Sequence, residues 1–248
     1  LVHQTKNPSA KEYFASNASE VDGIVGGGDI LQLKIRLAGL LATNLVSDVV
    51  QQEHNYFDFE SIINSNKILL VRVPKQSLGN HNTEFLGSMV LLMLHCVAEY
   101  QREKGLTPPE PYYVYIDEFQ NFASPSFAKF IDGAAKRGLS YTLSHQTLGQ
   151  ISSDMVRAMR EGIQNLISFQ LGGTDAQLLG EALAPSFGAG DVMNLGVRQF
   201  YIRMTVDSQP TAPFSGETDF VSYPEQNFAE AIVRASRSKV SDRERGGS

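Results

Sequence analysis

Two adjacent carboxylates, Asp117 and Glu118, follow directly after an apolar and aromatic run at 112–116. Such a run predicts a buried strand of a parallel sheet, and ligands of open α/β sheets bind at the carboxyl ends of the strands. There, Asp117 would hold a Mg²⁺ ion on a nucleotide, and Glu118 would polarise the water that attacks the terminal phosphate. A core strand that ends in a solvated acidic turn would give the same local pattern.

A second run of strand character, at 140–144, leads into Gln146. Between the two runs, 124–137 has helical character, with a Ser-Pro pair at its start and a glycine after its end. A right-handed crossover through this helix would bring the ends of both strands to one edge of the sheet. We therefore expect Asp117, Glu118 and Gln146 to converge there. A neutral amide beside two acids suits a group that detects the γ-phosphate or the attacking water.

Together these blocks make the sequence resemble the C-terminal half of the motor domain of TraG/TraD-type coupling proteins. These are DNA-pumping ATPases of conjugation and type IV secretion, within the HerA/FtsK superfamily. The resemblance covers roughly 57–218 and rests on the blocks at 67–71 (KILLV), 113–122 (YVYIDEFQNF), 138–140 (GLS), 144–150 (SHQTLGQ) and 199–201 (QFY). It implies a RecA-like α/β fold, with a mostly parallel sheet and helices on both faces.

The function implied by the resemblance is ATP-driven translocation of DNA toward a secretion channel. Asp117 and Glu118 would form the Walker B motif, with ATP and Mg²⁺ as cofactors, and Gln146 would report the γ-phosphate. The implied partners are DNA, relaxosome proteins and secretion-channel proteins. The intact protein is expected to be a cytoplasmic hexamer at the inner face of the inner membrane, although the resemblance does not indicate which residues contact DNA.

Lys136 and Arg137 lie at the end of the helix expected at 124–137. Members of the resembled family often carry an arginine near here that reaches the nucleotide of a neighbouring subunit, so this pair supplies candidates for a trans-acting finger. Aligned on Gly138, the usual arginine position holds Ala135. Favourable interaction of both cations with the carboxyl-terminal helix dipole is the alternative.

No Gly-x-x-x-x-Gly-Lys-Ser/Thr motif occurs in the 248 residues, so this sequence supplies neither a backbone cradle nor a lysine for phosphates. In the resembled family this motif lies upstream, and we expect a truncated motor domain that does not bind ATP tightly by itself. The alternatives are a degenerate relative, another HerA/FtsK-type translocase, or a non-catalytic docking module. Retention of Asp117, Glu118 and Gln146 argues against the docking module.

Composition is compatible with one α/β domain with a sizeable core, since 42% of the residues are hydrophobic. The net charge of -6 does not suit a free-standing nucleic-acid binder, but a ring-shaped motor needs only a few basic residues per subunit. The single cysteine, Cys96, excludes an intramolecular disulfide framework, and its apolar surroundings predict a core thiol. The most apolar run, 89–94, is too short to span a bilayer.

Hydrophobic periodicity and capping residues give the expected organisation of the chain. An N-terminal helical segment would cover 1–56, the motor-domain part 57–220, and a C-terminal helix with a disordered tail 221–248, the tail from 236. Helices are expected at 30–52, 58–64, 81–104, 154–162 and 175–183, and strands at 67–73, 166–171 and 199–206, with an edge hairpin at 211–218. Asp58 and Asp154 are expected helix caps, and the buried side of the helix at 81–104 would carry Phe85, Met89, Leu92, Met93 and Val97.

Overall fold

The chain divides into two compact units, 1–54 with 73–86, and 55–72 with 87–248. The computed structural model describes residues 46, 49, 57–106, 110–122, 127, 130, 131, 133–222 and 226–246. The helix expected at 30–52 lies outside the described residues, apart from Val46 and Val49, which are both helical. The predicted domain boundaries stay a prediction.

The first described helix begins where its capping residue predicts. α5 (Phe59–Asn64) follows Asp58, whose carboxylate accepts a hydrogen bond of 2.9 Å from the backbone N–H of Ser61. α6 (Lys75–Glu103) bends at Gly79, which has a φ of 76°, so the long helix expected at 81–104 starts just after this bend. No described helix is long and apolar enough to cross a membrane.

The strand predicted at 67–73 is wrong. The structure describes these residues in full and assigns no strand to them, and Ile68 is 89% exposed. An apolar sequence with high strand propensity becomes a strand only when a neighbouring chain segment pairs with its backbone. None of the described strands pairs with this segment.

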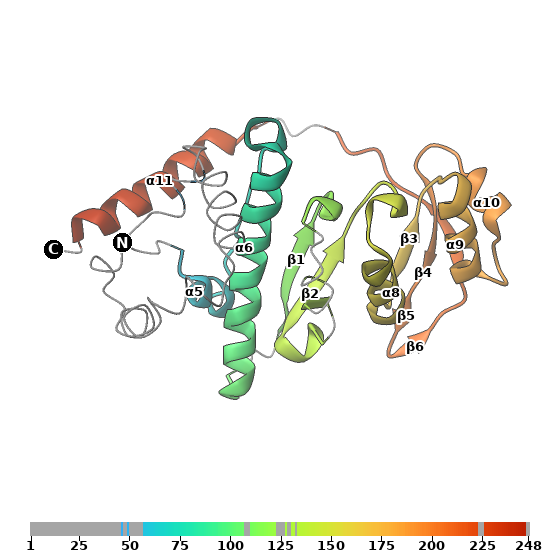
Figure 1. The fold of residues 1–248 in the computed structure, drawn as a ribbon, viewed down its shortest axis with the longest axis horizontal. Helices are drawn as coiled ribbons and strands as arrows, with labels where there is room; N and C mark the ends of the chain where they lie inside the picture. Colours follow the sequence, from blue (N-terminus) through green and yellow to red (C-terminus); the bar gives the residue numbers. More distant parts are fainter. Residues whose placement is uncertain are drawn as a thin grey trace, which may run out of the picture. The chain divides into compact units, whose positions relative to one another are not determined.

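β1 (Tyr112–Ile116) and β2 (Leu139–Leu143) form the expected parallel pair, and their last residues lie opposite each other. Figure 1 shows both strands between α6 and α8 (Ser153–Gly162). Of the connecting helix expected at 124–137, the described part ends in a 3-10 turn, η2 (Ala135–Arg137). Gly138 closes this turn with a φ of 73°, a left-handed conformation that glycine adopts without steric cost.

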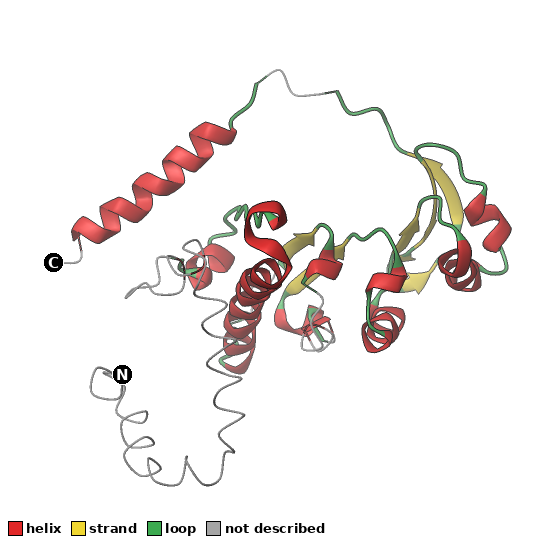
Figure 2. Ribbon diagram, turned by 45° about the horizontal axis from the view of Figure 1, so that its top comes forward, coloured by secondary structure: helices red, strands yellow, loops and turns green. Residues whose placement is uncertain are grey.

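One face of β1 carries the main core. Val114 and Ile116 are buried in a cluster with Leu91 of α6 and Met155 of α8. The residues that alternate with them, Tyr113 and Tyr115, are 57% and 74% exposed. The described helices therefore cover one face of this strand, and the second helical layer expected on the other face is not seen among the described residues (Figure 2).

The buried side of α6 differs from the predicted one, on which Met89 and Leu92 are in fact exposed. The buried stripe of its second part carries Gly87, Leu91, Leu94, Ala98 and Gln101. Small or polar residues occupy three of these five positions, so a search for large apolar residues selects a neighbouring face of the helix instead. Gly87 is required there because a Cβ would lie 2.1 Å from Cδ1 of Phe122. Cys96 is exposed, so the predicted core thiol is also wrong.

A second sheet follows α8 and is antiparallel. β4 (Gln199–Arg203) pairs with β3 (Leu166–Ser168) on one side and with β7 (Phe214–Glu217) on the other, which confirms the hairpin expected at 211–218. β5 (Thr205–Val206) and β6 (Gln209–Pro210) pair within the link between β4 and β7. The α/β class is confirmed, and the parallel arrangement holds for β1 and β2. The link between β4 and β7 contains only the short pair β5–β6, whereas β3 and β4 are antiparallel although α9 and α10 lie between them.

Helices α9 (Gly173–Leu183) and α10 (Ala189–Met193) pack together with the second sheet. Their shared core contains Ala176, Leu183 and Val192, with Tyr201 of β4 packed against it. We refer to α9 and α10 as the helical layer of the antiparallel sheet. Figure 1 shows the two helices beside β3 and β4.

Two helix termini differ from the sequence-based expectation. α8 is capped by Ser152, whose hydroxyl accepts a hydrogen bond of 3.3 Å from the N–H of Met155, whereas Asp154 lies in the first turn and pairs with Arg157. α11 (Ala229–Gly246) continues through most of the tail predicted to be disordered from 236. Polar composition indicated disorder, but alanine, arginine, lysine and glutamate are also good helix formers.

Candidate functional site

The end of β1 is shaped by a turn at Glu118. This residue has a φ of 52° and a ψ of 45°, a left-handed conformation that is uncommon for a residue with a side chain. Its carbonyl accepts hydrogen bonds from the backbone and the side chain of Asn121, both of 3.0 Å. Its N–H donates to Oδ1 of Asp117 over 3.1 Å. The turn interrupts the strand immediately after Asp117, so the two acids do not keep the alternation of a strand.

The loop 144–150 brings the end of β2 to this turn. The Ser144 backbone closes the pair of strands, because its N–H donates to Ile116 O and its carbonyl accepts from the N–H of Phe119, both over 3.0 Å. The hydroxyl of Ser144 donates to Oδ1 of Asp117. Next along the loop, Nε2 of Gln146 donates to Oε1 of Glu118 over 2.5 Å. The predicted convergence of the acidic pair with Gln146 is confirmed as geometry.

A second amide holds the other oxygen of the Glu118 carboxylate. Nε2 of Gln120 donates to Oε2 over 2.5 Å, so each carboxylate oxygen receives one amide hydrogen bond. Both partners are neutral, and a carboxylate has about four acceptor sites. Glu118 is therefore fixed in orientation and still has the capacity to accept a hydrogen bond from water. It is half-buried, whereas Asp117 is exposed.

His145 lies in the site loop, between Ser144 and Gln146. Its ring meets the buried ring of Phe119 edge-on, with 5.2 Å between centroids. Burial lowers the pKa of His145, and a backbone hydrogen bond at Thr147 and the negative charges of Asp175 and Glu118 offset this only in part. The neutral imidazole is thus favoured, which suits a packing role under the loop.

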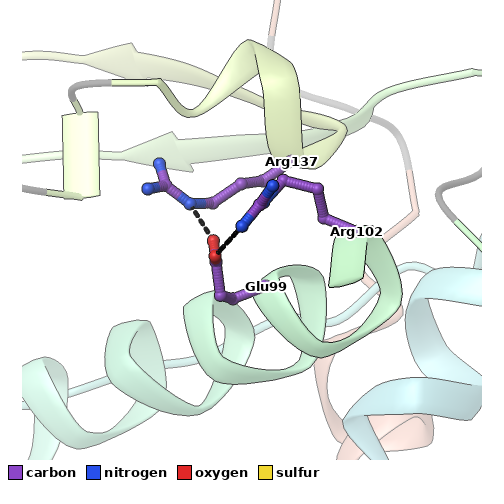
Figure 3. Close-up of polar contacts among 3 residues, drawn as sticks. All are labelled: Glu99, Arg102 and Arg137. Atoms are coloured by element: carbon purple, nitrogen blue, oxygen red, sulfur yellow. Dashed lines mark hydrogen bonds and ion pairs between the residues drawn. The ribbon is translucent and has the colours of Figure 1, made fainter. Parts of the chain in front are cut away.

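Arg137 forms an ion pair instead of projecting freely. Figure 3 shows its guanidinium against the Glu99 carboxylate of α6, which also pairs with Arg102 at 2.5 Å. The two guanidinium groups hold the pKa of Glu99 at about 2, well below its usual range. Lys136 is exposed. The trans-acting finger stays a prediction for both cations, and Arg137 would have to leave Glu99 to serve as one.

Comparison with known proteins finds a family model that is similar to the part of the chain that carries this site. Residues 111–200 match the family model described as the TraM recognition site of TraD and TraG, and both strand ends of the site lie within the match. This segment is similar to that family. The resemblance read from the sequence blocks is thereby confirmed for this part of the chain.

A solved structure is also similar to the chain. It is titled bacterial conjugative coupling protein TrwBdeltaN70, in an unbound monoclinic form, and matches with a TM-score of 0.47 and 14% sequence identity. The alignment covers 60% of this chain and 40% of that chain. No curated protein matches the sequence.

The acidic turn of this segment fits a magnesium ligand. Mg²⁺ is usually held by one or two carboxylates together with substrate phosphates. Asp117 is exposed, and both of its hydrogen bonds described above fall on the same oxygen, Oδ1. The described residues contain no group of three or more His, Cys, Asp or Glu that could hold a metal ion. Asp117 therefore has the chemistry of a single carboxylate ligand for Mg²⁺.

Sequence reasoning missed three residues of the site in this segment. Ser144 and Gln120 lie within the blocks that carried the resemblance, but nothing in their type predicted a hydrogen bond to an acid. Asp175 accepts a hydrogen bond of 2.9 Å from the N–H of Leu148 in the site loop. It lies 27 positions further along the chain, and no local signal connects it to the loop.

Proposed function

We propose that the chain is part of an ATP-driven motor that moves DNA in conjugation or type IV secretion. The observation that carries this proposal is the meeting of Asp117, Glu118 and Gln146 at the ends of two parallel strands. These residues lie inside the segment that is similar to the TraD and TraG family. A core strand ending in a solvated acidic turn does not require an amide from another strand end to hold its second acid.

In this proposal each polar group has a separate task. Asp117 holds the Mg²⁺ ion of a bound ATP, and this ion neutralises charge on the phosphates. Glu118 orients the attacking water through a carboxylate already fixed by Gln146 and Gln120. Such preorganised groups contribute to catalysis because they do not have to reorient during the reaction.

The phosphate cradle must come from sequence that this chain does not contain, because no Walker A motif occurs in it. We place that half in the full-length protein, assembled as a hexamer on DNA at the cytoplasmic face of the inner membrane. Relaxosome and secretion-channel proteins are the remaining proposed partners. Another HerA/FtsK-type translocase would have the same chemistry with different partners.

A docking role is the second candidate function, and it can coexist with the first. The matched family model is described as a TraM recognition site, which favours a TraM-type protein as partner. We expect such a protein from the same genetic element to bind the purified chain with a measurable heat in titration calorimetry. Absence of binding to both the chain and the full-length protein would remove this candidate.

The variant Glu118→Gln in the full-length protein tests the motor. The amide keeps the shape and a hydrogen-bonding oxygen but loses the charge that orients water. We expect ATP binding to persist and the rate of hydrolysis to fall by about 10²- to 10⁴-fold, the usual contribution of a general base. Steady-state hydrolysis with DNA present and nucleotide binding by calorimetry measure the two effects.

Two further variants make this test specific. Asp154→Asn changes an exposed acid on α8 that pairs with Arg157, and should leave hydrolysis unchanged. Asp117→Asn should weaken the dependence on Mg²⁺ as well as the rate, because the metal loses an anionic ligand. If Glu118→Gln hydrolyses ATP at the wild-type rate, Glu118 is a structural acid and the proposed motor chemistry at this site is refuted.

A further inference from the structure

The loop that carries Gln146 is held at both of its ends. At its start, the backbone of Ser144 is bonded to β1 through Ile116 and to the residue after the turn, Phe119. At its other end, the short helix η3 (Leu148–Gln150) leads into Ile151, which is buried in the main core. Gln146 lies between these two anchors, so its position depends on both.

The second anchor has no local cap. Thr147, the residue before η3, makes no side-chain hydrogen bond to the helix. The first N–H of such a helix has no partner within it and needs one from elsewhere. That partner is Asp175, whose Oδ2 accepts from the N–H of Leu148 over 2.9 Å. Because the acceptor is a carboxylate, this hydrogen bond is stronger than one to a neutral group.

Asp175 is itself held firmly by the helical layer of the antiparallel sheet. It lies in the first turn of α9, and the next residue, Ala176, is completely buried in the core shared with α10. The side chain of Leu148 packs instead against the main core around β1. The hydrogen bond from Leu148 to Asp175 therefore connects the site loop to a different hydrophobic core.

We propose that Asp175 is a positioning residue for the candidate site. Its carboxylate fixes the backbone of Leu148, and this keeps Gln146 in contact with Glu118. The orientation of Glu118, the proposed base, then depends on contacts with the helical layer as well as on β1 and β2. The role of Asp175 in ATP hydrolysis rests on the proposed function, whereas its role in holding the loop does not.

A simpler role for Asp175 is stabilisation of α9 as a first-turn acid, which requires no contact with the loop. The same layer offers a matched control for that role. Asp191 lies in the first turn of α10 and accepts a hydrogen bond of 2.7 Å from the N–H of Gly188, three residues earlier. Removing Asp191 disturbs the helical layer without removing a contact to the site loop.

Amide hydrogen exchange of the purified chain, followed by NMR, tests the loop contact directly. Asp175→Ala should speed exchange at Leu148 about 10- to 100-fold, as loss of one charge-assisted hydrogen bond permits, and should shift the side-chain amide signals of Gln146. Asp175→Asn keeps an oxygen acceptor but loses the charge, so its exchange rate at Leu148 should lie between those of wild type and Asp175→Ala. The proposal is overturned if Asp175→Ala changes neither signal, or if Asp191→Ala changes both equally.

Kinetics of the full-length protein test the consequence for the reaction. Asp175→Ala should lower kcat by about 10²-fold, as a misplacement of about 1 Å can, with little change in KM, and Asp175→Asn should restore most of the rate. If wild type does not hydrolyse ATP, the proposed function fails and the exchange data still decide the loop contact. If wild type is active and Asp175→Ala keeps its kcat, the positioning role is overturned and the motor stands.

Discussion

The contacts that shape the parallel pair β1–β2 join residues far apart in the sequence. The amide of Gln146 reaches Glu118 across 28 positions, and Asp175 reaches Leu148 across 27. Each of these contacts joins segments that only the folded chain brings together. The geometry of the site is therefore a product of the assembled fold.

The antiparallel sheet and its helical layer also have long-range contacts, such as the hydrogen bond of 3.1 Å that Arg203 donates to the carbonyl of Ala182 across 21 positions, but they carry side-chain contacts within single turns as well. Asp191 accepts from Gly188 three positions away, and Oε1 of Gln199 accepts from the N–H of Gly196, also three positions away. Such contacts form as soon as the local turn forms, with little loss of chain entropy. Both regions depend on pairing between strands that are far apart in the sequence, and they differ in that the acids of the candidate site are also held by side chains from distant segments.

The largest effect on the second region is expected from Gly180→Ala. A Cβ at Gly180 of α9 would lie 2.4 Å from the backbone N of Ala189 in α10, and backbone cannot move aside easily. We expect a loss of about 1–3 kcal/mol in the free energy of unfolding from overpacking, measured by urea denaturation.

Gly190→Ala is the matched control in the same layer, since a Cβ there meets nothing within 4 Å. It should be neutral or stabilise by about 0.5–1 kcal/mol, because alanine is the better helix former. Equal effects of the two variants would show that α9 and α10 do not approach closely, and the helical layer would lose its role as a firm anchor for Asp175.

A smaller effect is expected from Glu99→Gln, which removes a contact between α6 and Arg137 across 38 positions. The pKa of Glu99 is lowered from 4.5 to about 2 by its hydrogen bonds to Arg102 and Arg137. A depressed carboxyl pKa stabilises the fold above pH 4.5, and this contribution is lost as the pH falls from about 4.5 to about 2.

Glu99→Gln should therefore have a lower free energy of unfolding than wild type at neutral pH. Below pH 4.5, its free energy of unfolding should decline less steeply than that of wild type. Urea denaturation at a series of pH values measures this difference. Glu103→Gln removes another acid from the last turn of the same helix and should keep the wild-type pH profile. A wild-type profile for Glu99→Gln would mean that this ion pair does not stabilise the chain.

Sequence-based expectations succeeded where the signal was local. Asp58 caps α5 as its type and position indicate, and Gly138 ends the turn before β2. The runs at β1 and β2 became strands and paired in parallel, because the chain between them is long enough for a crossover. The convergence of the acidic pair with Gln146 was predicted from the positions of these residues at the ends of the two strands.

Expectations failed where packing decided the outcome. The apolar segment 67–73 pairs with none of the described strands, and it does not form a strand despite its strand propensity. The buried side of α6 includes Gly87 and Gln101, which no hydrophobic pattern would select. Gly87 is buried because the ring of Phe122 fills its space, and Gln101 is buried while its amide donates to Asn64 over 2.7 Å.

By itself, the sequence determined which residue types meet at the edge of the parallel pair. Residues after parallel strands share one edge of a sheet, and the order of the chain therefore brings Asp117, Glu118 and Gln146 together. Only the tertiary structure decided how they touch. Successive strand residues point to opposite faces, and the left-handed turn at Glu118 breaks that alternation. The amides on Glu118 and the carboxylate of Asp175 then fix the loop, because each hydrogen bond joins segments that only the folded chain brings within reach.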